Sequence, residues 1–446
     1  MTAYHCELAW LGGDAAEANV TIEVTDDRIT AVGAGGPPPP DAQRLPGLTL
    51  PGLANAHSHA FHRALRGRTQ TGKGSFWTWR EQMYSVAATL DPDSYFRLAR
   101  AVYGEMVLAG ITCVGEFHYL HHAPGGARYA DANAMGAALI AAADEAGLRI
   151  TLLDTCYLHG GFNTELNDVQ RRYGDGDAAG WAARAAELTA LESTTTRIGA
   201  AIHSVRAVAA RDIGAVAEWA RLRNAPLHAH VSEQPAENEQ CLAATGHTPT
   251  ELFAEHQALS ERFTAVHATH LSAHDIHLLG SSQCTACFCP TTERDLADGI
   301  GPARALRDGG ARLSLGSDSN AVIDVFEEAR AVELNERLAT QVRGSHDALS
   351  LLRAATSNGH VSLGWADAGT IAVGSLADFI TVRLDTLRTA GTRADHALES
   401  AVFAATAADV AHVVVGGRVV VSGGRHHSIE VAEELGASIA ALGSSR

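Results

Sequence analysis

Two histidines, His57 and His59, lie two positions apart at the end of a short apolar run. Alternate residues of a strand share a face, so both imidazoles can reach one ion. Imidazole suits zinc and iron, and a carboxylate completes a mixed site, so we expect His230 and Asp318 as the other protein ligands. An isolated His-x-His pair is more often two ordinary histidines, so the metal interpretation depends on the surrounding elements.

Two residues near these predicted ligands have side chains that can move protons. Glu233 follows His230 by three positions, where a carboxylate could take a proton from water and return it to a leaving group. His267 could hold or deprotonate the same water, and Asp318 could help to orient it. Taken alone, Glu233 is equally well explained as a solvated loop residue, and His267 as a core histidine bonded to the backbone.

Positioning these residues requires a parallel sheet, and the central part of the chain has the pattern of one. Short apolar runs alternate with longer alanine-rich segments, among which we expect helices at 131–146, 180–191 and 211–223. Eight such units predict an α/β chain folded as a (β/α)8 TIM-type barrel. The strands are expected at 50–56, 112–117, 149–156, 197–202, 226–230, 263–268, 283–289 and 312–316.

The carboxyl ends of these predicted strands are unusually polar. Active residues of such barrels lie at this end of the strands. The polar strand ends fall at 55–59, 116–119, 203–206, 228–233, 267–270 and 316–319. The convergence of polar residues from so many strands on one face is hard to explain as packing. It favours a single functional site.

Both ends of the chain have a different pattern, of short strands and turns. Apolar runs at 20–24 and 28–32 precede four prolines at 37–40, and further runs occur at 369–375, 377–382 and 413–421. We predict one small β-sandwich domain formed by residues 1–48 and 368–446, with the barrel domain spanning 49–367.

Composition restricts the partners and the compartment. The 446 residues include 34 Lys and Arg against 51 Asp and Glu, a net charge of −17, which argues against nucleic acid or an anionic membrane as partner. Seven cysteines in a long chain do not indicate a disulfide scaffold, and neither a signal peptide nor a run of about 18 apolar residues is evident. We therefore expect a cytoplasmic protein, and a homodimer by base rate.

Two arginines indicate the kind of substrate. Arg80 lies in an aromatic segment and Arg206 follows a predicted strand. Guanidinium groups bind carboxylates through two parallel hydrogen bonds, so the pair suggests a small dicarboxylate. Each arginine taken singly is as well explained by a surface ion pair.

The sequence resembles the amidohydrolase superfamily over nearly its full length. The resemblance depends on residues 51–59, 228–233, 266–268 and 316–319. Within the superfamily, the chain resembles the formimidoylglutamate deiminases of histidine degradation. The segments that carry this closer match are 57–61, 75–84, 116–122, 203–206 and 290–296.

The resemblance implies hydrolysis of N-formimidoyl-L-glutamate to N-formyl-L-glutamate and ammonia at one divalent ion, Zn²⁺ in the first place, with Fe²⁺ also compatible. It implies that the ion is held by His57, His59, His230 and Asp318. It further implies Glu233 and His267 as the proton-handling pair, and Arg80, Tyr119, His203 and Arg206 as substrate contacts. His62 is a further expected substrate contact, at a position where the family often has Gln. His also offers a donor and an acceptor, so we expect function to survive.

Two other metal arrangements are disfavoured. Binuclear relatives use a carbamylated lysine on a strand, but the one lysine of the chain, Lys73, lies in a glycine-rich loop, which favours a mononuclear site. The cysteine motif at Cys284 and Cys287 lacks the His-x-Glu partner of a cytidine-deaminase zinc site. We expect these cysteines, and Cys289, to be buried thiols.

Two other functions remain open at this point. The chain could be a mononuclear zinc deaminase of a purine-type or other amidine substrate, although a neutral ring does not need the two arginines. It could instead be a non-catalytic metal-binding protein on the same fold. The complete set of expected ligands and proton-handling residues disfavours that alternative.

Overall fold

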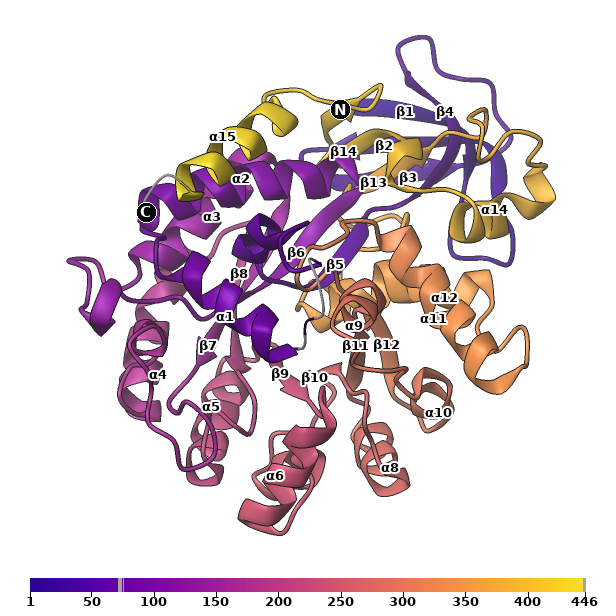
Figure 1. Cartoon of the computed structure of the whole chain (residues 1–446). Coiled ribbons are helices and arrows are strands. Elements are labelled where there is room, and N and C mark those ends of the chain that lie inside the picture. The colour runs from indigo at the N-terminus through magenta and orange to yellow at the C-terminus, as the bar shows by residue number, and fades with distance from the viewer. Residues whose placement is uncertain (71–73, 75, 444–446) are drawn as a thin grey trace.

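The computed structural model describes residues 1–70, 74 and 76–443 and contains two eight-stranded sheets. One sheet is parallel and curls into a nearly closed barrel, and the other is built from the strands of both termini (Figure 1). This confirms the predicted fold class, a TIM-type barrel with a separate β domain. Lys73 lies outside the described residues.

The barrel strands follow one another in chain order, as expected for repeated βα units. They are β5 (Leu53–Ser58), β6 (Ile111–His118), β7 (Arg149–Cys156), β8 (Thr196–Ile202), β9 (Leu227–Val231), β10 (Phe263–His267), β11 (Thr285–Phe288) and β12 (Arg312–Leu315). Seven of the eight predicted strands overlap these segments with shifts of one or two residues at their ends.

Residues 50–56, predicted as the first barrel strand, are divided between the two sheets, so the predicted start of that strand is wrong. Strand β4 of the terminal sheet ends at Pro51, and β5 of the barrel begins at Leu53. Gly52 lies between them, where an added Cβ would be 2.1 Å from the hydroxyl oxygen of Thr112. An apolar run that crosses from one buried sheet to another contains no polar signal to mark the change.

Closure of the barrel takes place at residues of the predicted site. Ser58 forms a parallel bridge with Asp318, which joins the first strand to the segment after the last. The backbone N–H of His59 donates to the carbonyl of Asp318, and the N–H of Asp318 donates to the carbonyl of His57, both at 3.0 Å. The seam of the barrel therefore holds two of the predicted ligand segments directly against each other.

Helices cover the outside of the barrel (Figure 1). Several begin with side-chain caps, such as Asp91 before α2 and Asp324 before α11. The helices that follow the barrel strands or lead into them are α1 (Phe76–Ala87), α2 (Pro92–Leu108), α3 (Ala134–Ala146), α4 (Ala178–Leu188), α5 (Ala210–Leu222), α6 (Pro235–Thr245), α7 (Pro249–Glu255), α8 (Ala273–Ser281), α9 (Pro290–Asp295), α10 (Ala303–Asp308), α11 (Val325–Thr340), α12 (Ala348–Arg353) and α13 (Gly359–Ser362). The three predicted helices correspond to α3, α4 and α5.

The terminal sheet interleaves strands from the two ends of the chain. Its strands are β1 (Thr2–Ala9), β2 (Glu17–Thr25), β3 (Arg28–Gly33), β4 (Gln43–Pro51), β13 (Phe379–Val382), β14 (Val410–Val415), β15 (Arg418–Ser422) and β16 (Arg425–His426). Strand β4 lies between β1 and β13, and Thr49 is paired with Thr381. The run at 369–375 forms turns instead of a strand, because Gly369 and Gly374 have left-handed backbone angles.

The C-terminal segment also contains two helices that pack on the barrel. Helix α14 (Ala397–Phe403) contacts α11 and α12, and α15 (Val431–Gly443) lies along α2, where Glu434 pairs with Arg100 (Figure 1). The domain boundaries at 48 and 367 stay a prediction. In the part of the chain that the structure describes, no helix is both long and apolar enough to cross a membrane.

Candidate active site

The predicted metal ligands converge at the carboxyl ends of the strands. His57 lies on β5, His59 directly after it, His230 on β9 and Asp318 just beyond β12. The Nε2 atoms of His57 and His59 lie 3.3 and 3.4 Å from Oδ1 of Asp318, and Nε2 of His230 lies 3.2 Å from Nε2 of His57. All four side chains are buried.

Backbone carbonyls determine which imidazole nitrogen faces the centre of this cluster. Nδ1 of His59 donates to the carbonyl of Phe117 at 3.0 Å, and Nδ1 of His230 donates to the carbonyl of His203 at 2.8 Å. With the proton on Nδ1, each ring presents the lone pair of Nε2 to the cluster. Two lone pairs and a carboxylate that face one another repel, and a cation between them would remove this repulsion.

The electrostatics and spacing of the cluster suit a divalent ion. Burial lowers the pKa of His57, His59 and His230, which keeps these imidazoles neutral. Burial would raise the pKa of Asp318, but the surrounding imidazoles hold it well below its ordinary value. Donor atoms of tetrahedral zinc lie about 3.3 Å apart, given metal–nitrogen distances of about 2.0–2.1 Å, which matches the observed spacing.

His267 and Glu233 lie beside this cluster. Nε2 of His267 is 3.9 Å from Oε1 of Glu233 and 3.8 Å from Oδ2 of Asp318, so His267 could also contribute a donor atom. Burial raises the pKa of Glu233 above its ordinary value. Burial acts to lower the pKa of His267, but the neighbouring carboxylates raise it well above its ordinary value. The arrangement can therefore exchange a proton between a carboxylate and an imidazole.

One acidic neighbour of His267 was not singled out from the sequence. Glu293, on α9, is buried, and its Oε1 lies 3.4 Å from Nδ1 of His267 and accepts the backbone N–H of Cys289 at 2.8 Å. It falls within the segment 290–296 that carries the closer family match, which was the available signal. Its contact orients the His267 ring so that Nε2 faces Glu233.

The backbone at two strand ends adopts conformations that are rare for residues other than glycine. His267 has φ of 66° and Asp318 has φ of 43°, both in the left-handed region. Such residues cost about 1–3 kcal/mol each and persist where the surrounding fold holds them. Gly316 makes the close approach possible, because an added Cβ would lie 2.8 Å from the Cβ of His57.

A cavity opens beside the cluster and contains every predicted substrate contact. Arg206 lies 3.8 Å from Glu233 and 3.4 Å from Glu237, a buried acid on α6 that we did not predict. The guanidinium of Arg80, on α1, lies 5.7 Å from the ring centre of Tyr84. The cavity is lined by His59, His62, Trp79, Arg80, Met83, Tyr84, Tyr119, Tyr157, Tyr173, His203, Arg206, His230, Glu233, His267, Leu296 and Asp318.

His62 and Tyr119 form a connected pair in this cavity. Nε2 of His62 lies 2.9 Å from the hydroxyl of Tyr119, and both side chains are buried. Burial lowers the pKa of His62 to about 3, so the ring is neutral and can act as donor or acceptor. His203 borders the same space, with its ring 4.5 Å from that of Tyr157.

Some polar strand-end residues lie away from the site. Phe117 and Tyr119 face it, whereas Glu116 and His118 point to the outer layer of helices, as alternation along β6 requires. His118 instead contacts His121 at 3.3 Å in a separate buried network. The expected CxxC cysteines are buried and free, as are the other cysteines, which confirms the prediction of buried thiols.

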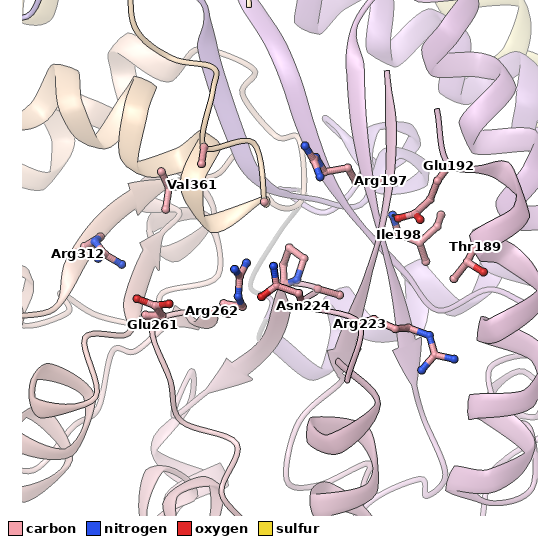
Figure 2. A pocket seen from close by; sticks show the side chains of 14 residues that line it. Thr189, Glu192, Arg197, Ile198, Arg223, Asn224, Glu261, Arg262, Arg312 and Val361 are labelled. Carbon is pink, nitrogen blue, oxygen red and sulfur yellow. The ribbon is translucent and has the colours of Figure 1, made fainter. Parts of the chain in front are cut away.

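A larger groove lies at the opposite end of the barrel and contains none of the predicted site residues. Its volume is about 520 Å³. Arg197 and Arg312 come from the first residues of β8 and β12, and Arg262 directly precedes β10 (Figure 2). The groove therefore marks the amino ends of the strands, and the imidazole cluster belongs to the other face.

A (β/α)8 barrel with imidazoles, a carboxylate and a proton-handling pair at its strand ends defines a class of enzymes that hydrolyse small molecules at a metal site. The model of the amidohydrolase family matches residues 48–420, and the chain belongs to this family. It is therefore a hydrolase of carbon–nitrogen bonds of the amidohydrolase deaminase type.

Three comparisons show which proteins of known sequence or structure the chain is similar to. It is 36% identical over 419 residues to formimidoylglutamate deiminase of Pseudomonas aeruginosa, covering 92% of each chain. It is 29% identical to 5-methylthioadenosine/S-adenosylhomocysteine deaminase of Natronomonas pharaonis, covering 91% of this chain and 88% of that protein. The crystal structure of an amidohydrolase from Brucella melitensis aligns over the full length of both chains, with a TM-score of 0.92 and 32% identity.

Proposed function

We propose that this enzyme hydrolyses N-formimidoyl-L-glutamate to N-formyl-L-glutamate and ammonia, as a step of histidine degradation. The observation that carries the proposal is that Arg80 and Arg206 line the same cavity as the predicted metal ligands. A substrate with two carboxylates matches two guanidinium groups, whereas a neutral purine offers no carboxylate for either of them to bind. The similarity to formimidoylglutamate deiminase of Pseudomonas aeruginosa supports the same substrate.

The proposed cofactor is one divalent ion held by His57, His59, His230 and Asp318. Nitrogen and oxygen donors suit Zn²⁺ first, and Fe²⁺ as an alternative. When bound, the ion lowers the pKa of water toward about 7 and so supplies a nucleophile at neutral pH.

Glu233 and His267 handle the protons in this proposal. Glu233 takes a proton from the attacking water and delivers it to the nitrogen that leaves as ammonia. His267 and Asp318 orient the water, and Glu293 keeps the ring of His267 in place. The raised pKa of Glu233, caused by burial, suits a group that must accept a proton from water before it releases one.

The remaining cavity residues position the substrate. Arg80 and Arg206 bind its carboxylates, with Tyr119 and His203 as further contacts and His62 supporting Tyr119. A carboxylate that leaves water needs compensating hydrogen bonds, which charged donors supply best. The orientation that results places the formimidoyl carbon at the cluster.

The test is ammonia release from N-formimidoyl-L-glutamate by the metal-loaded enzyme, run beside adenosine, 5-methylthioadenosine and guanine. We expect turnover of the amidine alone, its loss with a chelator, and at least a tenfold fall in kcat/KM for Arg206→Gln, as for loss of a charged hydrogen bond. Arg353→Gln, on α12 and away from the cavity, is the matched control. Turnover of a purine without turnover of the amidine would replace the proposal by the purine deaminase alternative.

A further inference from the structure

The side-chain amide of Gln170 joins two tyrosines of the cavity. Its Nε2 donates to the hydroxyl of Tyr84 at 3.0 Å and to the hydroxyl of Tyr157 at 2.9 Å. Gln170 is only 3% exposed, so these contacts are shielded from water. Both tyrosines line the same cavity as Arg80 and Arg206.

The orientation of this amide follows from the backbone. Oε1 of Gln170 accepts the backbone N–H of Asn167 at 3.0 Å, and Oδ1 of Asn167 accepts the backbone N–H of Gln170 at 2.9 Å. A backbone N–H can only donate, so the oxygen of the amide must face Asn167. The NH₂ group is therefore the side that faces the two tyrosines.

This orientation determines what the tyrosine hydroxyls can do. Each phenol oxygen accepts a hydrogen bond from the amide of Gln170, so the hydrogen of each hydroxyl must be donated elsewhere. Among the described residues, neither hydroxyl contacts a further acceptor. Burial raises the pKa of Tyr157, with a smaller opposing effect of Arg206, so this hydroxyl keeps its proton at neutral pH. Each tyrosine hydroxyl can therefore donate one hydrogen bond, for which the described residues supply no acceptor.

We propose that Tyr84 and Tyr157 donate hydrogen bonds to one carboxylate of the substrate, and that Gln170 is the positioning residue that makes both of them donors. The inference rests on the proposed function, since it assigns new residues to the binding of its acidic substrate. A carboxylate has about four lone-pair positions, and a guanidinium can occupy two of them. Two tyrosine hydroxyls supply the remaining donors.

Such a donor set would also distinguish a carboxylate from its amide. A carboxamide turns an NH₂ group toward a guanidinium that has no lone pair and toward tyrosine oxygens that already accept from Gln170, which leaves buried groups unpaired. Sites built on hydrogen bonds reject mismatched analogues much more strongly than apolar pockets do. We therefore expect strong discrimination against the analogues in which either carboxylate of N-formimidoyl-L-glutamate is an amide.

Gln170→Glu is the sharpest variant, because it keeps the shape but reverses the hydrogen bonds. The new carboxylate still accepts from Asn167, but it would accept from the tyrosines instead of donating to them. Tyr84→Phe and Tyr157→Phe remove one donor each, and Gln170→Met removes the positioning contact without adding charge. Tyr4→Phe, which loses a 2.9 Å bond to the carbonyl of Gly417 in the terminal sheet, is the matched control.

Steady-state kinetics with N-formimidoyl-L-glutamate provide the test, with thermal stability and metal content measured for each variant. We expect KM to rise about 10- to 100-fold in each Phe variant and further in Gln170→Glu, with kcat within about threefold, as for loss of hydrogen bonds to a charged group. Discrimination against one amide analogue should fall in the same variants. Tyr4→Phe should change stability alone. A wild-type KM in both Phe variants, or in Gln170→Glu, overturns the inference, even if stability falls.

A direct binding measurement separates this inference from the proposed reaction. If the wild-type enzyme releases no ammonia from N-formimidoyl-L-glutamate, the proposed function fails, and calorimetry with glutarate, a plain dicarboxylate, then tests the tyrosine pair alone. Binding to the wild type that weakens at least tenfold in Tyr157→Phe and Gln170→Glu supports the inference. No binding to the wild type, or equal binding to all variants, overturns it.

Discussion

His57 and His230 are 173 positions apart in the chain, yet their Nε2 atoms lie 3.2 Å apart at the carboxyl end of the barrel. A backbone carbonyl holds the proton of His230 on Nδ1, so the facing nitrogen carries a lone pair. The carboxylate of Asp318 completes the contact with His57 at 3.3 Å.

Removal of the ion should destabilise the fold as well as abolish activity. Without a cation, buried lone pairs face each other without compensation, and a ligand at 1,000 times its Kd adds about 4 kcal/mol to the free energy of unfolding. We expect a chelator to lower Tm by several degrees, and added Zn²⁺ to restore both Tm and ammonia release. The Asp318→Asn variant should show a smaller response of Tm to Zn²⁺. An unchanged Tm after verified metal removal would contradict this prediction.

Glu233→Gln should lower kcat by at least about 10²-fold, because positioned acid–base catalysis is worth that much. The amide keeps the size of the side chain but cannot accept a proton from water. Glu239→Gln, an exposed change on helix α6, which begins two residues after Glu233, should retain full activity. Metal content should be equal in both variants. Near-normal ammonia release by Glu233→Gln would remove Glu233 from the proposed role.

His62→Gln should retain activity within about tenfold, because Gln also offers a donor and an acceptor to Tyr119. The neutral state of His62, whose pKa burial lowers to about 3, means that no charge is lost. His62→Leu should lose more, since it leaves the Tyr119 hydroxyl without its partner. Measuring kcat and KM of the two variants tests this prediction. Equal losses in both would show that the size of the imidazole is what counts.

Glu116→Gln should make the protein less sensitive to alkaline pH. Burial raises the pKa of Glu116 to about 8, so the folded state keeps its proton while the unfolded state releases it above about pH 4.5. The free energy of unfolding of the wild type therefore falls as pH rises between these values, and the variant lacks that loss. Urea unfolding at pH 5 and pH 8 should show the variant gaining about 3–4 kcal/mol over the wild type between the two pH values. An equal difference at both pH values would refute the assignment.

Local patterns in the sequence predicted the barrel and most of its strands, because strand and helix periodicity are properties of neighbouring residues. The same patterns were wrong at 50–56 and 369–375. In the first case the chain passes between two buried sheets at Gly52, and in the second two glycines turn the chain. Burial in either sheet produces the same apolar run, so the boundary depends on tertiary contacts such as that with Thr112.

The direction of side chains was harder to predict than their grouping. Period two shows that Glu116 and His118 share one face of a strand, and Phe117 and Tyr119 the other. It does not show which face points into the barrel. Closure of the sheet at Ser58 and Asp318 decides this, because it fixes the inner surface for every strand.

The sequence by itself determined the chemistry available to this protein: which residues can bind an ion, which can carry a proton, and at which strand ends they occur. Tertiary structure alone decided the distances among them and the roles of loop residues. Gln170 illustrates the difference, since its amide acquires a direction only where Asn167 and two tyrosines meet it. Hydrogen bonds depend on geometry to within a few tenths of an ångström, and residue types and spacing do not encode that geometry directly.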